Sequence, residues 1–324
     1  MFEDMINKIH LGDCMEVMKQ MPDKCVDLVL TDPPYYKIVN KEWDRQWKTL
    51  QDFQAWVGTI GAEIKRIMKD NASFYWFGDD KNIAYCQIEL DKYFNLLNNL
   101  VWRKTPVMVK GINFNRSYTP VTERILFYDK GERFTGLEML YSSVECFNSI
   151  KSYMREEKAK IKQAHGFTTE KQFNNFINGV TNTKSIVSRH YFTDSQWCFP
   201  TAEIYKKLQT TGYFKREYEA LRQEYEALRR PWQSAPDAYD VLRFLVQSAG
   251  RIHETQKPVD LIAYLIERSS HPAAIVFDPF SGSGTTAVAC HKLNRRFICV
   301  EKDPDYHQAS VKRLKKEQKQ LMMF

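Results

Sequence analysis

Apolar and polar residues alternate in short blocks over the first 140 residues, and the spacing of the apolar ones predicts strands and helices in turn. Five short runs rich in apolar or aromatic residues predict strands, at 8–13, 26–30, 73–77, 97–103 and 123–128. Apolar residues recur every three or four positions at 50–69, which predicts a helix, and a second helix is expected near 81–93. Strands that alternate with helices in this way predict an α/β sheet.

The middle of the chain, residues 141–244, has a different pattern. It is polar, rich in Lys, Gln, Asn and Thr, and is expected to be mainly helical. Within it the segment 216–222 is followed at once by a near copy, 223–229. Five apolar side chains then share one helical stripe, namely Phe214, Tyr218, Leu221, Tyr225 and Leu228. Two heptads are too few for an independent coiled coil, so packing within the chain is favoured and a homodimer through the stripe stays open.

From about residue 245 the strand and helix pattern returns. Lys257-Pro258 starts a helix with a proline near its first turn. A buried strand at 274–277, a helix at 285–292 and a final strand at 296–301 follow. We therefore expect one α/β domain formed by residues 1–140 and 245–324, which a helical insertion at 141–244 interrupts.

The composition is that of an ordinary globular protein. Of 324 residues, 43% are hydrophobic and 27% charged, and the mean hydropathy is −0.51, values that exclude a disordered or fibrous chain. No window of about 18 apolar residues occurs, so no membrane-spanning helix is expected, and the acidic start of the chain predicts no secretory signal. The seven cysteines are scattered without a Cys-x-x-Cys pair, so we expect reduced thiols in a cytoplasmic protein, without a disulfide framework or a metal site.

The net charge of +7 is concentrated in three stretches. Residues 101–118 hold four bases and no acid, residues 151–195 hold eight bases and four acids, and residues 311–324 hold five bases and one acid. Such stretches suit a polyanionic partner, and any one of them equally suits a solvated face or a solubilising tail.

Residues 277–286, Phe-Asp-Pro-Phe-Ser-Gly-Ser-Gly-Thr-Thr, form a predicted strand, a glycine turn and the start of a helix. Glycines let the backbone approach a ligand, and Glu301 at the end of the next strand can hold ribose hydroxyls. No Lys-Ser or Lys-Thr follows the glycines, which excludes a P-loop. Asp278 stands where a pyrophosphate would otherwise lie, so S-adenosylmethionine, which is cationic and has no phosphates, fits better than a nicotinamide dinucleotide.

A second motif, Asp32-Pro33-Pro34-Tyr35, directly follows the strand at 26–30, at the edge of an α/β sheet where ligands bind. The Asp32 carboxylate and the Pro33 carbonyl can each accept one hydrogen of an exocyclic amino group. The Tyr35 ring can stack on a planar base. The motif therefore predicts a planar amine as the substrate.

With these two motifs in this order, the chain resembles the β group of DNA amino-methyltransferases, over about residues 1–135 and 250–310. The resemblance implies a Rossmann-like, S-adenosylmethionine-dependent methyltransferase sheet and a helical target-recognition insertion. It implies methylation of the N6 amino group of adenine in double-stranded DNA after base flipping, because Asp-Pro-Pro-Tyr is typical of the adenine enzymes. N4-cytosine methylation is the nearest alternative, and RNA or protein amide methylation and a non-catalytic DNA-binding module are weaker ones. Catalytic roles are implied for Asp32, Pro33, Pro34 and Tyr35.

The resemblance also implies two sets of binding residues. The cofactor set comprises Asp13, Thr255, Gln256, Lys257, Asp278, Pro279, Phe280, Gly282, Ser283, Gly284, Thr285 and Glu301. In the insertion, predicted helices at 168–178 and 183–191 around a turn at 179–182 have the proportions of a helix-turn-helix. The DNA-binding set comprises Lys184, Ser188, Arg189 and His190 there, with Arg103 and Lys104 beside the expected base pocket. A bacterial or phage enzyme is implied, with or without a restriction partner, and its recognition sequence cannot be read from the chain.

Overall fold

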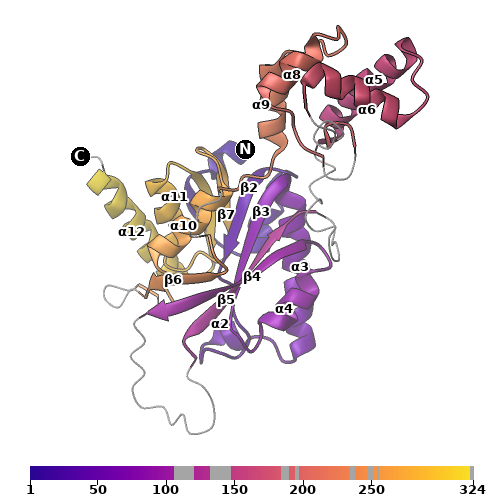
Figure 1. The fold of residues 1–324 in the computed structure, drawn as a ribbon. Coiled ribbons are helices and arrows are strands. Elements are labelled where there is room, and N and C mark those ends of the chain that lie inside the picture. Colours follow the sequence, from indigo (N-terminus) through magenta and orange to yellow (C-terminus); the bar gives the residue numbers. More distant parts are fainter. Residues whose placement is uncertain are drawn as a thin grey trace. The chain divides into compact units, whose positions relative to one another are not determined.

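The structure is a computed structural model and describes residues 1–105, 120–131, 147–183, 190–193, 197–233, 238–246, 252–253 and 255–321. Its contacts divide the chain into two compact units. The first unit comprises Met1–Arg133 and Arg230–Phe324, and the second comprises Phe134–Arg229. The first carries the sheet, and the described part of the second is helical (Figure 1).

The described residues of the first unit form one eight-stranded sheet in the order β1-β8-β7-β2-β3-β5-β4-β6. The strands are β1 (Lys8–Leu11), β2 (Val26–Thr31), β3 (Met68–Gly78), β4 (Asn95–Thr105), β5 (Thr122–Asp129), β6 (Val241–Leu245), β7 (Ile275–Asp278) and β8 (Arg296–Glu301). The five strands from β1 to β3 in this order pair in parallel, β5 runs antiparallel to β3 and β4, and β6 pairs in parallel with β4. The predicted α/β fold class is confirmed.

Helices cover both faces of this sheet (Figure 1). They are η1 (Phe2–Met5), α1 (Cys14–Met18), α2 (Glu42–Arg45), α3 (Leu50–Ile67), α4 (Ile83–Leu90), α10 (Val259–Ser269), α11 (Thr285–Lys292) and α12 (Pro304–Leu321). Successive side chains of a strand point to opposite faces. On β2, Val29 accordingly joins the core beneath α3, while Leu28 and Leu30 join the core beneath α10 and α11.

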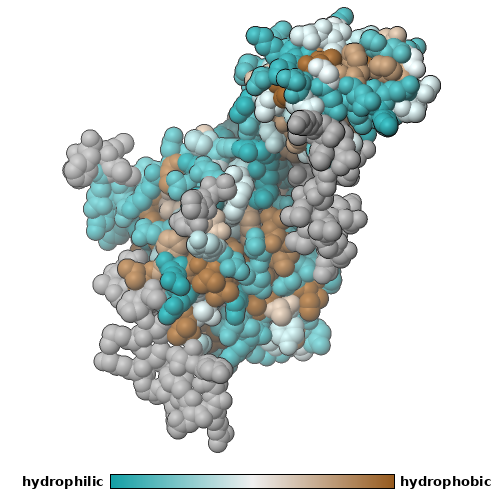
Figure 2. Space-filling view, viewed as in Figure 1, coloured by the Kyte–Doolittle hydropathy of each residue, from teal (hydrophilic) through white to brown (hydrophobic). Residues whose placement is uncertain are grey.

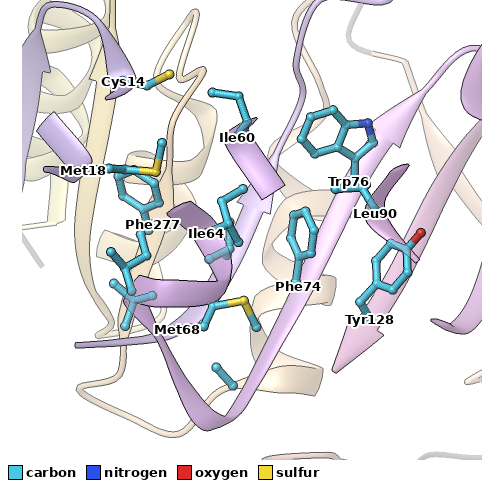
Figure 3. Packing of buried hydrophobic residues seen from close by; sticks show 14 of the residues in the cluster. Cys14, Met18, Ile60, Ile64, Met68, Phe74, Trp76, Leu90, Tyr128 and Phe277 are labelled. Carbon is cyan, nitrogen blue, oxygen red and sulfur yellow. The ribbon is translucent and has the colours of Figure 1, made fainter. Parts of the chain in front are cut away.

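Helix α3 shows how the sequence dictates these elements. Thr49 caps its first turn by accepting a hydrogen bond from the backbone N–H of Asp52, whose carboxylate accepts one in return from the N–H of Thr49. Its apolar stripe, which includes Ile60 and Ile64, is fully buried against the sheet, next to Phe74 of β3 (Figure 3). The predicted helix at 50–69 is therefore correct to within two residues.

The second unit has four described helices, α5 (Asn148–Ala164), α6 (Glu170–Thr181), α8 (Ala202–Gln209) and α9 (Tyr218–Leu228). They enclose a separate aromatic core, and the visible surface around it is mainly hydrophilic (Figure 2). The stripe of the seven-residue repeat packs into this core, with Phe214 and Leu221 buried and Tyr218 and Tyr225 partly buried. The repeat therefore packs within its own chain, as expected.

Two expectations about the insertion need revision. Residues 241–245 form β6, which pairs with β4, so the end of the expected insertion belongs to the sheet. Leu242 is buried there against the sheet core, whereas its neighbours Val241 and Arg243 are exposed. Helix α6 continues through Gly179 and ends at Asn182, whose φ of 53° places it in the left-handed region that Asn tolerates. Most of the second expected helix, residues 184–189, lies outside the described residues.

The chain re-enters the first unit close to where it leaves. Asp129, at the end of β5, pairs with Ser73 of β3. The Arg230 guanidinium donates a hydrogen bond of 3.3 Å to the Ser73 hydroxyl and lies over the ring of Phe127. The ring of Trp232 stacks on Phe127 at 5.4 Å between centroids.

None of the helices within the described residues combines the length and apolar character that crossing a membrane requires.

Replacing Gly284 by Ala should lower the free energy of unfolding by about 2–4 kcal/mol. Gly284 has φ of +73°, and a Cβ there would lie 2.9 Å from the Cβ of Ser310 on α12. Urea denaturation measures the loss. The double variant Gly284→Ala/Ser310→Gly should lose less than the two single variants added together, because the close contact is gone. Strict additivity would contradict the packing argument.

Candidate active site

The parallel pairing of β2 with β7 joins the two sequence motifs. Leu28 pairs with Val276 and Val29 with Phe277, so Asp32 and Asp278 end neighbouring strands at the same edge. Both carboxylates line a cavity of about 760 Å³ within the first unit. Asp13, which follows β1, and Glu301, which ends β8, line it too. Four acids from four strand ends therefore share one cavity.

The cavity brings together all the expected catalytic residues and all the expected cofactor residues except Gly284. Gly284 does not line it, and its missing side chain instead makes room for Ser310 and Ile9. Gly282, with φ of +50°, does line the cavity, so this is the glycine whose backbone a ligand can approach.

Asp32 is held by two donors. The Tyr35 hydroxyl donates to its Oδ1 at 2.5 Å, and the Lys257 ammonium donates to its Oδ2 at 2.6 Å. The same ammonium lies 3.2 Å from Oε2 of Glu123, whose Oε1 pairs with Lys104 at 2.5 Å. Only 6% of the Lys257 side chain and 13% of that of Glu123 are exposed, so this ion network is largely shielded from water.

The charges of the network stabilise one another. Burial opposes the charge on Lys257, yet Asp32 and Glu123 outweigh it, and the pKa of the ammonium is raised. Burial opposes the charge on Glu123 as well, but Lys257 and Lys104 lower its pKa. Burial and the charges of Asp32 and Glu123 raise the pKa of Tyr35 well above its ordinary value, which keeps the phenol protonated as a donor.

Two side chains that the sequence analysis did not single out fix the loop after Asp32. The fully buried Asp44 carboxylate accepts hydrogen bonds from the backbone N–H of Tyr35 at 2.6 Å and of Val39 at 2.7 Å. The Asn82 amide donates to the carbonyls of Tyr35 and Tyr36 at 2.7 and 2.8 Å. These bonds hold Tyr36 at φ of 64°, a conformation that an aromatic residue rarely adopts.

Two carboxylates fasten the glycine loop. Asp278 accepts hydrogen bonds from the N–H of Phe280 at 3.1 Å and from the Thr286 hydroxyl at 2.5 Å. Glu301 accepts from the N–H of Gly282 at 2.7 Å. Burial raises the pKa of Asp278 to about 7, against the effect of its two hydrogen bonds and with a contribution from the charges of Asp32 and Glu301. Burial also raises the pKa of Glu301.

Helix α12 braces the same loop, although the sequence analysis predicted no helix there. Arg313 donates to the Ser283 carbonyl and to the Thr285 hydroxyl, both at 3.1 Å. One base of the stretch 311–324 thus has a structural partner rather than belonging to a solvated tail.

Aromatic side chains form another part of the cavity lining. The His253 ring lies between Trp43 and Tyr306, at centroid distances of 6.0 and 4.3 Å. Trp56 contacts Phe280 at 5.5 Å. These rings come from widely separated parts of the chain, so no local motif could have revealed that they lie together.

The structure describes three of the six expected DNA-binding residues. Arg103 is exposed on β4, but the neighbouring Lys104 is engaged by Glu123. His190, in the second unit, is partly buried. Lys184, Ser188 and Arg189 lie outside the described residues.

Comparison with known proteins identifies the family. Residues 26–312 match the model of the family described as DNA methylase, whose name joins N6 and N4 methyltransferases. The match spans most of the chain, and the chain therefore belongs to the DNA methylase family.

Two curated relatives and two solved structures are similar along almost the whole chain. The chain is 25% identical to the type II methyltransferase M.HinfI of Haemophilus influenzae, covering 96% of this chain and 69% of the relative. It is 25% identical to the DNA adenine methyltransferase YhdJ of Escherichia coli K12, covering 94% and 81%. Two solved structures share the fold. One is the PvuII cytosine-N4-specific DNA methyltransferase, with a TM-score of 0.55 and 14% identity over 96% of this chain and 90% of that one. The other is the M1.HpyAVI complex with S-adenosylmethionine, with a TM-score of 0.51 and 19% identity over 95% of this chain and 99% of that one.

Asp278 should make the stability of the ligand-free protein depend on pH. Its pKa is raised from 3.8 to about 7, so the folded protein binds the proton more tightly and loses stability as the pH rises through this window. Asp278→Asn, which cannot ionise, should gain about 2–3 kcal/mol of unfolding free energy relative to the wild type between pH 5 and pH 8. Denaturation at both values measures this difference. An equal gap at both would contradict the assignment.

Proposed function

We propose that the protein is a site-specific DNA methyltransferase that transfers a methyl group from S-adenosylmethionine to the N6 amino group of adenine in double-stranded DNA. The observation that carries the proposal is the meeting of Asp32 and Asp278, from two separate motifs, in one cavity. Membership of the DNA methylase family and the similarity to YhdJ, a DNA adenine methyltransferase, support it.

The cavity suits the proposed cofactor. The two donors that bind the buried Asp278 carboxylate, the Phe280 N–H and the Thr286 hydroxyl, are both neutral, so a cationic ligand would offset its charge. The Glu301 oxygens accept hydrogen bonds from the backbone N–H groups of Gly282 and Asp303, and a carboxylate offers about four acceptor positions, so room for ribose hydroxyls remains. S-adenosylmethionine supplies a cationic amino group, ribose hydroxyls and, at its sulfonium, the electrophilic methyl group.

Asp32 is the acceptor we assign to the target amino group. Tyr35 and Lys257 each occupy one position on its two oxygens, and a carboxylate offers about four, so room for an amino hydrogen remains. The Pro33 carbonyl is the proposed acceptor for the second hydrogen. Drawing both hydrogens toward acceptors turns the nitrogen lone pair out of conjugation and toward the methyl group. The remaining catalysis is alignment of the nitrogen with the methyl carbon, so that the N–C bond forms as the C–S bond breaks; the thioether S-adenosylhomocysteine leaves, and the nitrogen gives up one proton.

The proposed substrate base lies inside a duplex, so it must be flipped out of the stack, at a cost of a few kcal/mol. Phosphate contacts by basic residues would offset this cost. The mainly helical second unit, with the basic stretch 151–195, is the part we assign to target recognition. Such an enzyme would work on DNA in the bacterial cytoplasm.

N4-cytosine methylation remains the second candidate, because the PvuII cytosine-N4-specific methyltransferase has the same fold. Mass spectrometry of nucleosides from DNA methylated by the purified protein separates the two. N6-methyladenine is the expected product, and N4-methylcytosine would replace the first candidate by the second.

Asp32→Ala should reduce methyl transfer to DNA by at least about 100-fold, because the amino group loses its charged acceptor. Its affinity for S-adenosylmethionine should stay within about twofold of the wild type. Tritium transfer and calorimetry measure the two quantities. Asp70→Ala removes an ion-paired carboxylate outside the cavity and serves as the control. Normal turnover of the Asp32 variant would overturn the proposed mechanism.

The double variant Lys184→Ala/Arg189→Ala should weaken binding to all DNA sequences by a similar factor, because phosphate contacts do not depend on the base sequence. Affinity for DNA falls as salt rises, and each lost phosphate contact makes the plot of log affinity against log salt shallower by about 0.9. The double variant should therefore make it shallower by about 1.8. Fluorescence anisotropy over a salt series measures the slope. Lys206, exposed on α8, gives the control Lys206→Ala. An equal effect of the control would argue against the assigned contacts.

A further inference from the structure

One ion pair of the cavity joins two residues for which the sequence predicted different tasks. Lys257 was expected among the cofactor residues, but its ammonium lies 2.6 Å from Oδ2 of Asp32, which is 225 residues away in the chain. It also lies 3.2 Å from Glu123 and 3.2 Å from the hydroxyl of Tyr35. The ammonium is therefore placed at the carboxylates of the proposed base pocket.

We propose that Lys257 is a positioning residue for methyl transfer, whose ammonium keeps Asp32 ionised and correctly oriented beside a second, partly buried carboxylate, Glu123. The consequence for catalysis rests on the proposed function. The electrostatic effect of Lys257 on Asp32 belongs to the ligand-free protein and can be measured without any reaction.

The carboxylates of Asp32 and Glu123 lie close together. The Tyr35 hydroxyl lies 2.5 Å from Oδ1 of Asp32 and 3.4 Å from Oε2 of Glu123, so one phenol bridges both acids. Two carboxylates that one hydroxyl can reach, in a site largely shielded from water, do not both ionise readily unless a cation contacts them. Lys257 meets this condition because its ammonium contacts both.

Other charged groups near Asp32 do not replace Lys257. Lys104 of β4 pairs with the opposite oxygen of Glu123. Asp278 of β7 acts electrostatically on the same region with a further negative charge, and Asp79, after β3, raises the pKa of Tyr35. Among the described residues, Lys257 is the cation that contacts Asp32.

Ionisation of Asp32 determines what it can do for the substrate. A carboxylate only accepts hydrogen bonds, whereas a protonated carboxyl presents a donor and is a weaker acceptor. The target amino group offers hydrogens, so it needs the ionised form. Lys257 also occupies Oδ2, and Tyr35 occupies Oδ1, which fixes the rotation of the carboxylate that the amino group meets.

Lys257→Met should therefore move the acidic limb of the pH profile of kcat upward by about one to three pH units. At a pH on the acidic limb kcat should fall by about tenfold or more, while the KM for S-adenosylmethionine stays within about twofold. Lys257→Arg should keep the wild-type limb, because it restores the cation. Lys257→Met/Glu123→Gln should move the limb back down, because it removes the second negative charge. Lys69→Met breaks a Lys–Asp pair of the same 2.6 Å length with Asp27, and should leave the profile unchanged.

A second measurement does not depend on turnover. Carbon-13 NMR of labelled aspartates, with Asp32→Asn to assign the signal, follows the Asp32 carboxyl in the ligand-free protein. It should titrate at a higher pH in Lys257→Met than in the wild type. An unchanged titration would overturn the proposal. A pH profile that does not move, together with tenfold weaker cofactor binding, would also overturn it and would make Lys257 a cofactor contact. If the wild type methylates no DNA, the proposed function fails, and the NMR comparison still decides the effect of Lys257 on Asp32.

Discussion

The site depends on the parallel pairing of β2 with β7. Parallel strands present their carboxyl ends at one edge, so this pairing alone brings Asp32 and Asp278 together from nearly opposite ends of the chain. Asp27 of β2 fixes the register, since its carboxylate accepts a hydrogen bond of 2.9 Å from the N–H of Ile275 at the start of β7. A shift of one residue would turn the buried side chains of β2 to the wrong faces and separate the two motifs.

The same pairing concentrates negative charge, and the structure offsets each carboxylate in a different way. Asp32 has the Lys257 ammonium, while Asp44 is bound by two backbone N–H groups of the loop that it holds. Glu301 accepts hydrogen bonds from the backbone N–H groups of Gly282 and Asp303. Asp278 also has neutral donors, but burial outweighs them and raises its pKa to about 7. Asp278, whose pKa burial raises in this way, is the acid that we assign to a cationic ligand.

Local sequence revealed the chemistry of the site better than its geometry. The two motifs and most sheet strands were predictable, because proline, glycine and apolar runs act over a few residues. The pairing of Lys257 with Asp32 and the bonds of Asn82 were not, because they join residues that only the complete fold brings together. Strand β6 was missed because it forms by pairing with the distant β4, and Gly284 was assigned to the ligand because its contact with Ser310 on α12 leaves no local signal.

The closeness of the points where the chain leaves and re-enters the first unit has an evolutionary consequence. Ser73 is paired with Asp129 at the exit and hydrogen-bonded to Arg230 at the return, so the sheet is continuous without the intervening segment. An inserted segment with neighbouring ends can be lengthened, shortened or exchanged while its host keeps its strand order. Recombination at these two points would change what is inserted and leave the methyl-transfer cavity as it is. The target recognition that we assign to the insertion and the methyl transfer that we assign to the cavity can then diversify at different rates within one gene.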